Sequence, residues 1–269
     1  MEARRRLVEG PAPGILTCRI IPKLDIKNNT VVKGVHLEGL RVVGAPNIMA
    51  EHYYETLADE IIYSDVVASL YGRNNLAELV EEVSRRVFVP LVVGGGIRSL
   101  EDIESLLRAG ADKVAVNSWA IQNPEFINRA AGTFGAQCII GQVEAKQRPD
   151  GSWEALYNCG RERSGRDALL WARELEDRGA GELLLISVDR DGTGRGFDIE
   201  LVQRVADTVH VPVIANGGAG SVQQVREVIE HGDASAVAIS RALHTAAFTI
   251  GEVKDEIHGE STLWRAGRI

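Results

Sequence analysis

Several features that would define a class of protein are scarce or missing in this sequence. Its three cysteines, Cys18, Cys138 and Cys159, have neither the spacing of a metal site nor that of a disulfide framework, which favours a reduced, cytoplasmic setting. No apolar run approaches the ~20 residues of a membrane span, and no nucleotide-cofactor motif is present. The formal net charge of −8 argues against a nucleic-acid polymer as the main partner. We therefore expect no metal, no cofactor and no membrane association.

The length of 269 residues, with 45% hydrophobic residues, suits one large α/β barrel. We expect a flexible N-terminal lead over residues 1–18, a single barrel domain over residues 19–258 and a C-terminal tail over residues 259–269. The lead lacks the long apolar core of a signal peptide.

The second half of the chain repeats the first. The stretch VPLVVGGGIRSLEDIESLLRAGADKVAVNS from Val89 aligns without a gap with VPVIANGGAGSVQQVREVIEHGDASAVAIS from Val211. Each copy is typical of a buried strand, a glycine turn, an amphipathic helix and a second strand, which together make one βαβ unit of a parallel sheet. Two glycine turns of a phosphate-binding type suggest a ligand with two anionic groups.

Eight short, β-branched runs alternate with helical segments such as residues 76–87 and 167–179. This alternation, with its internal halving, predicts an α/β fold, a (β/α)8 TIM barrel with duplicated half-barrels, and leaves an open doubly wound sheet as the alternative. The predicted strands begin at Arg19, Glu60, Pro90, Lys113, Cys138, Glu182, Val211 and Ser235.

Two inserts follow the first and fifth predicted strands, where barrel active sites are built. The first, residues 27–46, has no clear structure of its own and is expected to serve as a lid, with Lys33 facing the ligand. The second, residues 146–160, holds Pro149-Asp150-Gly151 and predicts a small hairpin.

Two acidic residues end the polar faces of the first and fifth predicted strands. Alternation along a strand points Asp25 and, in the repeat, Glu144 into the barrel at its rim. Carboxylates on opposite sides of a substrate suit general acid and general base catalysis. The structural alternative is that a strand-end acid only pairs with Lys23 or caps a loop.

The glycine turns favour phosphate binding, because backbone amides can approach an anion there and the following helix start adds its positive end. Side-chain donors at the ends of the next strands, and the loop at Asp189, extend the two sites. The candidate binding residues are Gly95, Gly96, Asn117, Ser118, Asp191, Gly192, Thr193, Gly217, Gly218, Ser240 and Arg241.

Four charged residues begin inward-facing series and should meet at the opposite end, the barrel floor: Arg19, Glu60, Lys113 and Glu182. A buried ionic ring is seldom better for stability than apolar packing. It is either a plug that satisfies polar strand ends or a gate to the barrel axis.

The chain resembles the cyclase subunits of imidazole glycerol phosphate synthase, duplicated barrels of histidine biosynthesis, from about Arg19 to Glu256. The matching motifs are RIIPxLD, VVKGV, VGGGIRS, GADKVxxNS, GAGELLL, DRDGTxxG and GGAG. The resemblance implies that ammonia, made by a class I glutaminase subunit docked at the floor in a heterodimer, is used at the rim to cleave and cyclise a bisphosphorylated ribulosyl aminoimidazole carboxamide nucleotide. The implied products are imidazole glycerol phosphate and an aminoimidazole carboxamide ribotide.

Carried over by position, the resemblance implies that Asp25 is catalytic, that Lys33 is the loop lysine and that Asp112 lies at the glutaminase interface. It implies that the four floor residues gate ammonia. It divides the binding residues into one phosphate site with Gly95, Gly96, Asn117 and Ser118, and another with Asp191, Gly192, Gly217, Gly218 and Ser240.

The sequence departs from the family pattern at the rim. Glu144 replaces an aspartate, Lys23 stands where the family usually has cysteine, and Gln142, Asn216 and Arg241 replace smaller residues. Three functions therefore stay open: a synthase of the family type, a paralogue that conducts ammonia from a glutaminase to a sugar amidotransferase of surface polysaccharide synthesis, and the single-chain aminoaldose isomerase of the histidine pathway. The floor residues and the VVKGV motif argue against the isomerase.

Overall fold

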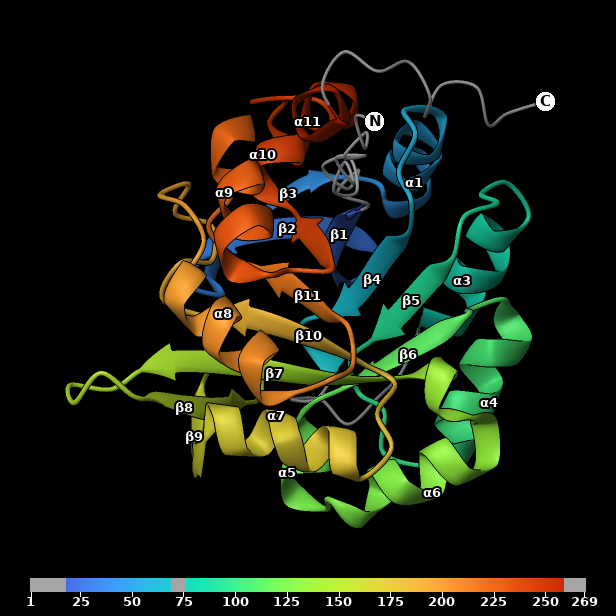
Figure 1. Ribbon diagram of the computed structural model, residues 1–269. Coiled ribbons are helices and arrows are strands. Elements are labelled where there is room, and N and C mark those ends of the chain that lie inside the picture. The colour runs from blue at the N-terminus through green and yellow to red at the C-terminus, as the bar shows by residue number, and fades with distance from the viewer. Residues whose placement is uncertain (1–17, 69–75, 259–269) are drawn as a thin grey trace, which may run out of the picture.

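The computed structural model describes residues 18–68 and 76–258. The predicted tail and all of the predicted lead except Cys18 lie outside these residues. The strand that begins at Arg19 opens the fold and the helix that ends at His258 closes it (Figure 1).

Eight parallel strands form a closed barrel in the order β10-β11-β12-β1-β4-β5-β6-β7, and pairing of β7 with β10 completes the circle. The predicted barrel is thus confirmed and the open sheet is excluded. The strands are Arg19–Lys27 (β1), Ile61–Asp65 (β4), Leu91–Gly94 (β5), Lys113–Val116 (β6), Ile139–Gln147 (β7), Glu182–Ser187 (β10), Val213–Asn216 (β11) and Ala236–Ile239 (β12).

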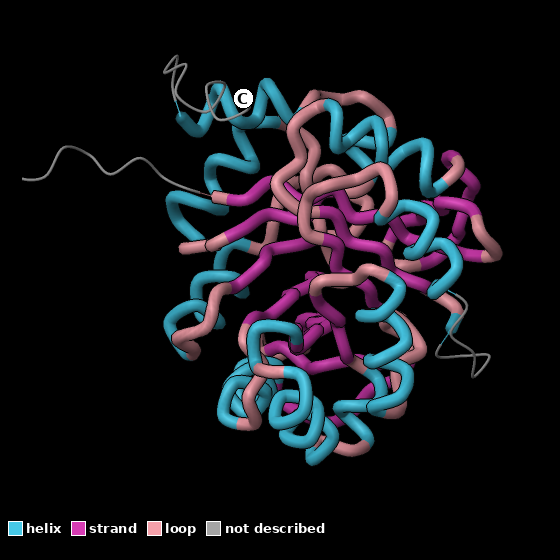
Figure 2. Tube along the Cα trace, turned by 90° about the vertical axis from the view of Figure 1, so that its right-hand side faces the viewer, coloured by secondary structure: helices cyan, strands magenta, loops and turns pink. Residues whose placement is uncertain are grey.

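Helices surround the barrel (Figures 1 and 2). They bury apolar faces against the outer side of the strands, as Ile103 and Leu106 do from α4 and Trp171 and Leu175 do from α7. The helices are Pro46–Glu55 (α1), Leu76–Ser84 (α3), Leu100–Ala109 (α4), Ser118–Gln122 (α5), Glu125–Phe134 (α6), Ala168–Asp177 (α7), Ile199–Thr208 (α8), Val222–Gly232 (α9), Arg241–His244 (α10) and Ile250–His258 (α11), with a 3-10 turn at Ala136–Cys138 (η1).

The internal repeat is visible in the structure, with one difference from the ungapped alignment. The β5 and β11 strands and the caps Ser99 and Ser221 correspond, but α9 is one residue longer than α4 and ends at Asp233 in a left-handed conformation. Beyond this helix the inward-facing residue equivalent to Asn117 is therefore Ser240, which the ungapped alignment had paired with Ser118. Both residues are the N-caps of short helices, α5 and α10.

The first insert is not structureless, so that prediction was wrong. It forms an antiparallel hairpin of Thr30–Val35 (β2) and Glu38–Gly44 (β3), which extends from β1. Its turns place Asn28-Asn29 and His36-Leu37 at positive φ, a conformation of two-residue hairpin turns that the sequence signals less clearly than Asn-Gly would.

The predicted second hairpin is confirmed. Trp153–Tyr157 (β8) pairs with the extension of β7, and Glu162–Asp167 (β9) pairs with β8. The β7–β8 hairpin projects from the barrel, at left in Figure 1. Both hairpins follow the carboxyl ends of strands, so they rise on the rim side of the barrel.

Candidate active site

At the floor, the four charged residues predicted to meet there form a closed ring. Arg19 pairs with Glu60 and with Glu182, while Lys113 Nζ lies 3.0 Å from Glu60 Oε1 and 2.8 Å from Glu182 Oε2. Burial would lower the pKa of Lys113, but the two glutamates outweigh this effect and the pKa is raised. The ring is therefore charged and internally neutral. Beside it, Asp112 accepts a 2.8 Å hydrogen bond from Leu91 N.

At the rim, Asp25 belongs to a buried cluster of two acids and two lysines. Lys23 pairs with Asp25 Oδ1, and Lys33 Nζ lies 2.8 Å from Asp25 Oδ2 and 2.8 Å from Asp191 Oδ1. All four residues are buried, with Asp25 only 2% exposed. Burial would raise the pKa of Asp25, but the two ammonium groups outweigh it and hold the pKa well below its ordinary value. Asp25 is thus ionised, and Lys33 holds the β2–β3 hairpin to the loop after β10.

Glu144 ends the inward face of β7, which is the fifth strand around the barrel from β1 and so lies across the mouth from Asp25. Its carboxylate accepts hydrogen bonds from Gln142 Nε2 at 2.9 Å and from Gly160 N at 2.7 Å. Burial raises its pKa, and these hydrogen bonds and the charge of Lys23 only partly oppose the shift. The pKa values of the two acids of the predicted pair therefore shift in opposite directions, because of the two acids only Asp25 contacts cations directly among the described residues.

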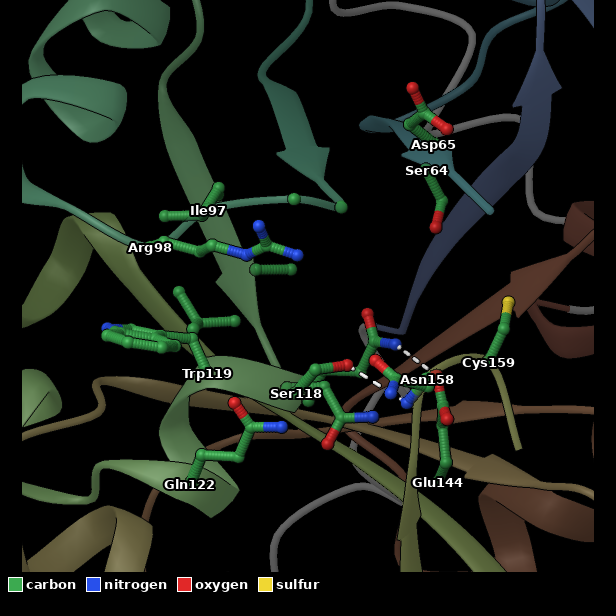
Figure 3. A pocket seen from close by; sticks show the side chains of 16 residues that line it. Ser64, Asp65, Ile97, Arg98, Ser118, Trp119, Gln122, Glu144, Asn158 and Cys159 are labelled. Atoms are coloured by element: carbon green, nitrogen blue, oxygen red, sulfur yellow. Dashed lines mark hydrogen bonds between the residues drawn. The ribbon is translucent and has the colours of Figure 1, made fainter. Parts of the chain in front are cut away.

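The first-half candidate site opens into a cavity of about 190 Å³ beside Glu144. The turn residues Gly95 and Gly96 have φ of 103° and 71° and line it, together with Asn117 and Ser118. The Ser118 hydroxyl accepts a 3.0 Å hydrogen bond from Asn158 N (Figure 3). Sequence reasoning missed further lining residues, whose only signal was their position near a glycine turn, a strand end or a hairpin; among them are Arg98, Trp119, Gln122, Asn158 and Cys159.

The second-half candidate site is covered by the loop that follows β10. Gly217 and Gly218 have φ of 101° and 111°, and a Cβ at Gly218 would lie 2.1 Å from Gly196 O of that loop, so only glycine fits there. Arg241 Nη1 donates a 2.6 Å hydrogen bond to Gly192 O. In the same region the Thr193 hydroxyl bonds Arg190 O at 2.8 Å.

The helices after the two glycine turns do not present free N-termini. Ser99 accepts a hydrogen bond from Asp102 N and Ser221 from Gln224 N, and the Asp102 carboxylate completes a capping box with the Ser99 backbone. The contribution of these helix starts to anion binding stays a prediction, in which the cap side chains already occupy the Asp102 and Gln224 amides. By contrast, Asn117 and Ser240 make no side-chain cap bond to α5 and α10.

No helix among residues 18–68 and 76–258 is long and apolar enough to cross a membrane. Within the same residues no group of three or more histidine, cysteine or acidic side chains is arranged to hold a metal ion.

The family model "Histidine biosynthesis protein" matches residues 19–249, which include the ring at the floor and the acids at the rim. The sequence is 54% identical over 206 residues to the imidazole glycerol phosphate synthase subunit HisF of Legionella pneumophila, which covers 77% of this chain and 97% of that protein. It is 44% identical to the subunit of the same name from Nostoc sp. over 91% of this chain and 95% of that protein. The match with the Lactococcus lactis subunit is also 44%, over 90% of this chain and 94% of that protein.

The chain therefore belongs to the family of imidazole glycerol phosphate synthase cyclase subunits, the lyases of histidine biosynthesis that work within a glutamine amidotransferase complex.

Proposed function

We propose that this chain takes ammonia from a class I glutaminase subunit at its floor and uses it at the rim to cleave and cyclise a bisphosphorylated ribulosyl aminoimidazole carboxamide nucleotide. The products would be imidazole glycerol phosphate and an aminoimidazole carboxamide ribotide. The observation that carries the proposal is the combination of a closed charged ring at one end of the axis with two buried carboxyl groups, whose pKa values shift in opposite directions, at the other. The three free cysteines suit a reducing cytoplasm.

In this proposal the two acids have different roles. Burial raises the pKa of Glu144, and a raised pKa suits a general acid, so we assign it that role. Asp25 is ionised, and when substrate displaces one of its lysines it serves as the general base. Lys33 then positions the substrate, because it already contacts both rim aspartates.

The two candidate anion sites would hold the two phosphates. The first uses the turn at Gly95 and Gly96 with the Asn117 and Ser118 side chains, which line the open cavity. The second uses the turn at Gly217 and Gly218, which the loop after β10 covers, and the side chains around that turn. Its residues are Asp191, Gly192, Thr193, Gly217, Gly218, Ser240 and Arg241. The Ser240 hydroxyl is buried and has no hydrogen-bond partner among the described residues, which supports a ligand contact there.

The glutaminase would bind the floor in a heterodimer, with Asp112 at the interface and the four ring residues as the gate. The ring supports a gate because all of its charges are paired with one another, so a small change in one pair opens it without exposing an isolated buried charge.

The decisive experiment is a steady-state assay of the purified chain with the bisphosphorylated nucleotide and an ammonium salt. We expect turnover, and at least ~100-fold lower kcat in Asp25→Asn, as is usual when a general base is lost. Exposed Glu101→Gln on α4 serves as the matched control and should keep full activity. Unchanged kcat in Asp25→Asn would remove the assigned role of Asp25.

The gate is tested by Lys113→Ala in the reconstituted complex with the glutaminase. This variant removes one of the two cations that Glu60 and Glu182 share and leaves them paired with Arg19 alone. We expect glutamine hydrolysis to continue while less product forms per glutamine consumed. Unaltered stoichiometry would remove the gate role.

One observation favours a second candidate, the ammonia-conducting paralogue. Lys23 and Lys33 both engage Asp25 inside a buried cluster, so the acid is occupied before any substrate binds. A complete lack of turnover at high ammonium, with glutamine hydrolysis intact in the complex, would favour this candidate over the cyclase.

A further inference from the structure

One layer of side chains inside the barrel is polar, and the strand registers define its members. Lys23 pairs with Ile62, and Ile62 with Val92. Because barrel strands are tilted, the residue at the height of Lys23 lies about two positions beyond Val92, at Gly94. The same step repeated around the barrel returns to Lys23, so the layer consists of Lys23, Gly94, Gln142 and Asn216.

Beneath this layer the barrel interior is apolar. Two layers of buried aliphatic side chains separate it from the charged ring, and they belong to one packed cluster that includes Ile21, Ile62 and Ile140. An unpaired charge is costly in such surroundings, whereas a small neutral molecule is not. Anything that crosses from the floor to the rim passes these two apolar layers first and then the polar layer.

Three members of the layer have side chains, and each is committed to a partner. Lys23 extends up to Asp25, and Asn216 Nδ2 donates a 2.7 Å hydrogen bond to Ala238 O on the neighbouring strand. Gln142 Nε2 donates to Glu144. The side chains of Lys23 and Asn216 therefore close the layer on the β11–β12–β1 side. The corner at Gly94 has no side chain at all.

The Gly94 corner lies directly beneath the reaction cavity. A Cβ added at Gly94 would lie 3.2 Å from Ala115 Cβ and 3.8 Å from Gln142 Oε1. Ala115 and Gln142 both line the cavity that also holds Glu144 and the first glycine turn. The cavity thus descends into the barrel at this corner, beside the Gln142 amide.

We propose that ammonia enters the reaction cavity off the barrel axis, through the Gly94 corner, and that Gln142 is the positioning residue that receives it. This inference rests on the proposed function. Because Gln142 Nε2 is held by Glu144, its Oε1 faces Gly94 and accepts an N–H of the arriving ammonia, whose lone pair stays free for attack on the substrate. The route avoids Asp25, which would stabilise the unreactive ammonium form.

The test uses the complex reconstituted with a class I glutaminase subunit and compares Gly94→Ala with the unmodified chain. The methyl group narrows the corner, and the 3.2 Å contact with Ala115 requires only a small shift. We expect glutamine-dependent turnover to fall at least ~10-fold, while turnover with an external ammonium salt, which enters from the rim, falls less than ~3-fold. The control is Ala238→Val, which narrows the barrel interior on the side of β12, away from Gly94. It should not lower glutamine-dependent turnover relative to ammonium-dependent turnover.

A second variant, Gln142→Met, tests the amide while keeping the side-chain length. We expect KM for ammonium to rise ~10-fold with a smaller change in kcat, because only reception of ammonia is lost. Thermal unfolding of every variant checks that the barrel remains folded.

Parallel loss of both activities in Gly94→Ala, or uncoupling in Ala238→Val alone, would overturn the off-axis route. Lack of turnover by the unmodified chain with ammonium would instead overturn the proposed function, so the two failures are distinguishable.

Discussion

The two halves of this barrel carry equivalent acids in opposite electrostatic environments. In the first half, Asp25 is fixed between two buried lysines, while in the second half Glu144 is held by an amide side chain and a backbone N–H. The two candidate anion sites differ in accessibility. The first-half site is open, whereas the second-half site is covered by the loop after β10 and by Arg241. Duplication has preserved the backbone positions, and substitution of a few side chains has made the halves chemically distinct.

The largest expected difference between the halves is in stability. Asp25→Asn removes the one acid that Lys23 contacts among the described residues and leaves that buried cation without an acidic partner there, which should lower the free energy of unfolding by about 3–5 kcal/mol. Glu144→Gln replaces a carboxyl group that contacts no cation in the described part of the chain by an amide of similar shape and should change the free energy of unfolding by about 1 kcal/mol or less. Urea denaturation at pH 7 measures the free energy of unfolding of both variants. Equal losses in the two variants would contradict the predicted difference between the two halves.

The second prediction concerns the anion sites. Arg241→Ala removes a charge-assisted donor from the covered site, so KM for the bisphosphorylated nucleotide should rise ~10-fold or more. Ser118→Ala removes one neutral hydroxyl from the open site, and KM should rise only ~3-fold. Steady-state kinetics check both values. The reverse order would mean that Arg241 bonds only to Gly192 and does not contact the ligand.

The third prediction is a pH dependence of opposite sign for the two acids. The pKa of Glu144 is raised, so the native chain keeps a proton that the unfolded chain loses above about pH 4.5, and stability falls with rising pH in that window. Glu144→Gln should therefore gain stability relative to the unmodified chain from pH 4.5 upward. The pKa of Asp25 is lowered, so its contribution is present above about pH 3.8 and is lost as the pH falls further. Chemical denaturation at several pH values checks both signs.

The smallest predicted difference lies in the helix caps. Ser99 takes part in a capping box with Asp102, whereas Gln224, at the equivalent position after Ser221, accepts from Gly220 N instead. Ser99→Ala should lower the unfolding free energy by about 1 kcal/mol and Ser221→Ala by about 0.5 kcal/mol. Differential scanning calorimetry of the two variants measures these losses. A larger loss in Ser221→Ala than in Ser99→Ala would contradict the prediction.

The sequence predicts the barrel well because every strand has a strong local pattern and the repeat supports each half with the other. It predicts the floor ring for the same reason, since inward-facing parity places Arg19, Glu60, Lys113 and Glu182 at strand starts. It fails at the first insert, where Asn28-Asn29 and His36-Leu37 make tight turns without glycine. It also gives no sign of the capping box, in which the Asp102 side chain accepts from the Ser99 backbone.

The opposite pKa shifts of the two rim acids could not be predicted from the sequence, for a different reason. Lys23 and Asp25 are close along one strand, but the contact of Lys33 with both Asp25 and Asp191 joins three separate segments. The membership of the polar layer likewise depends on strand register, which local patterns do not encode.

The most direct test of the account is a titration of the two rim carboxyl groups by carbon-13 NMR, with Asp25→Asn and Glu144→Gln used to assign the signals. We predict that Glu144 titrates above the ordinary value of 4.5 for a glutamate, while Asp25 remains ionised far below its ordinary value of 3.8. A spectrum in which Asp25 takes up its proton before Glu144 as the pH is lowered would contradict it.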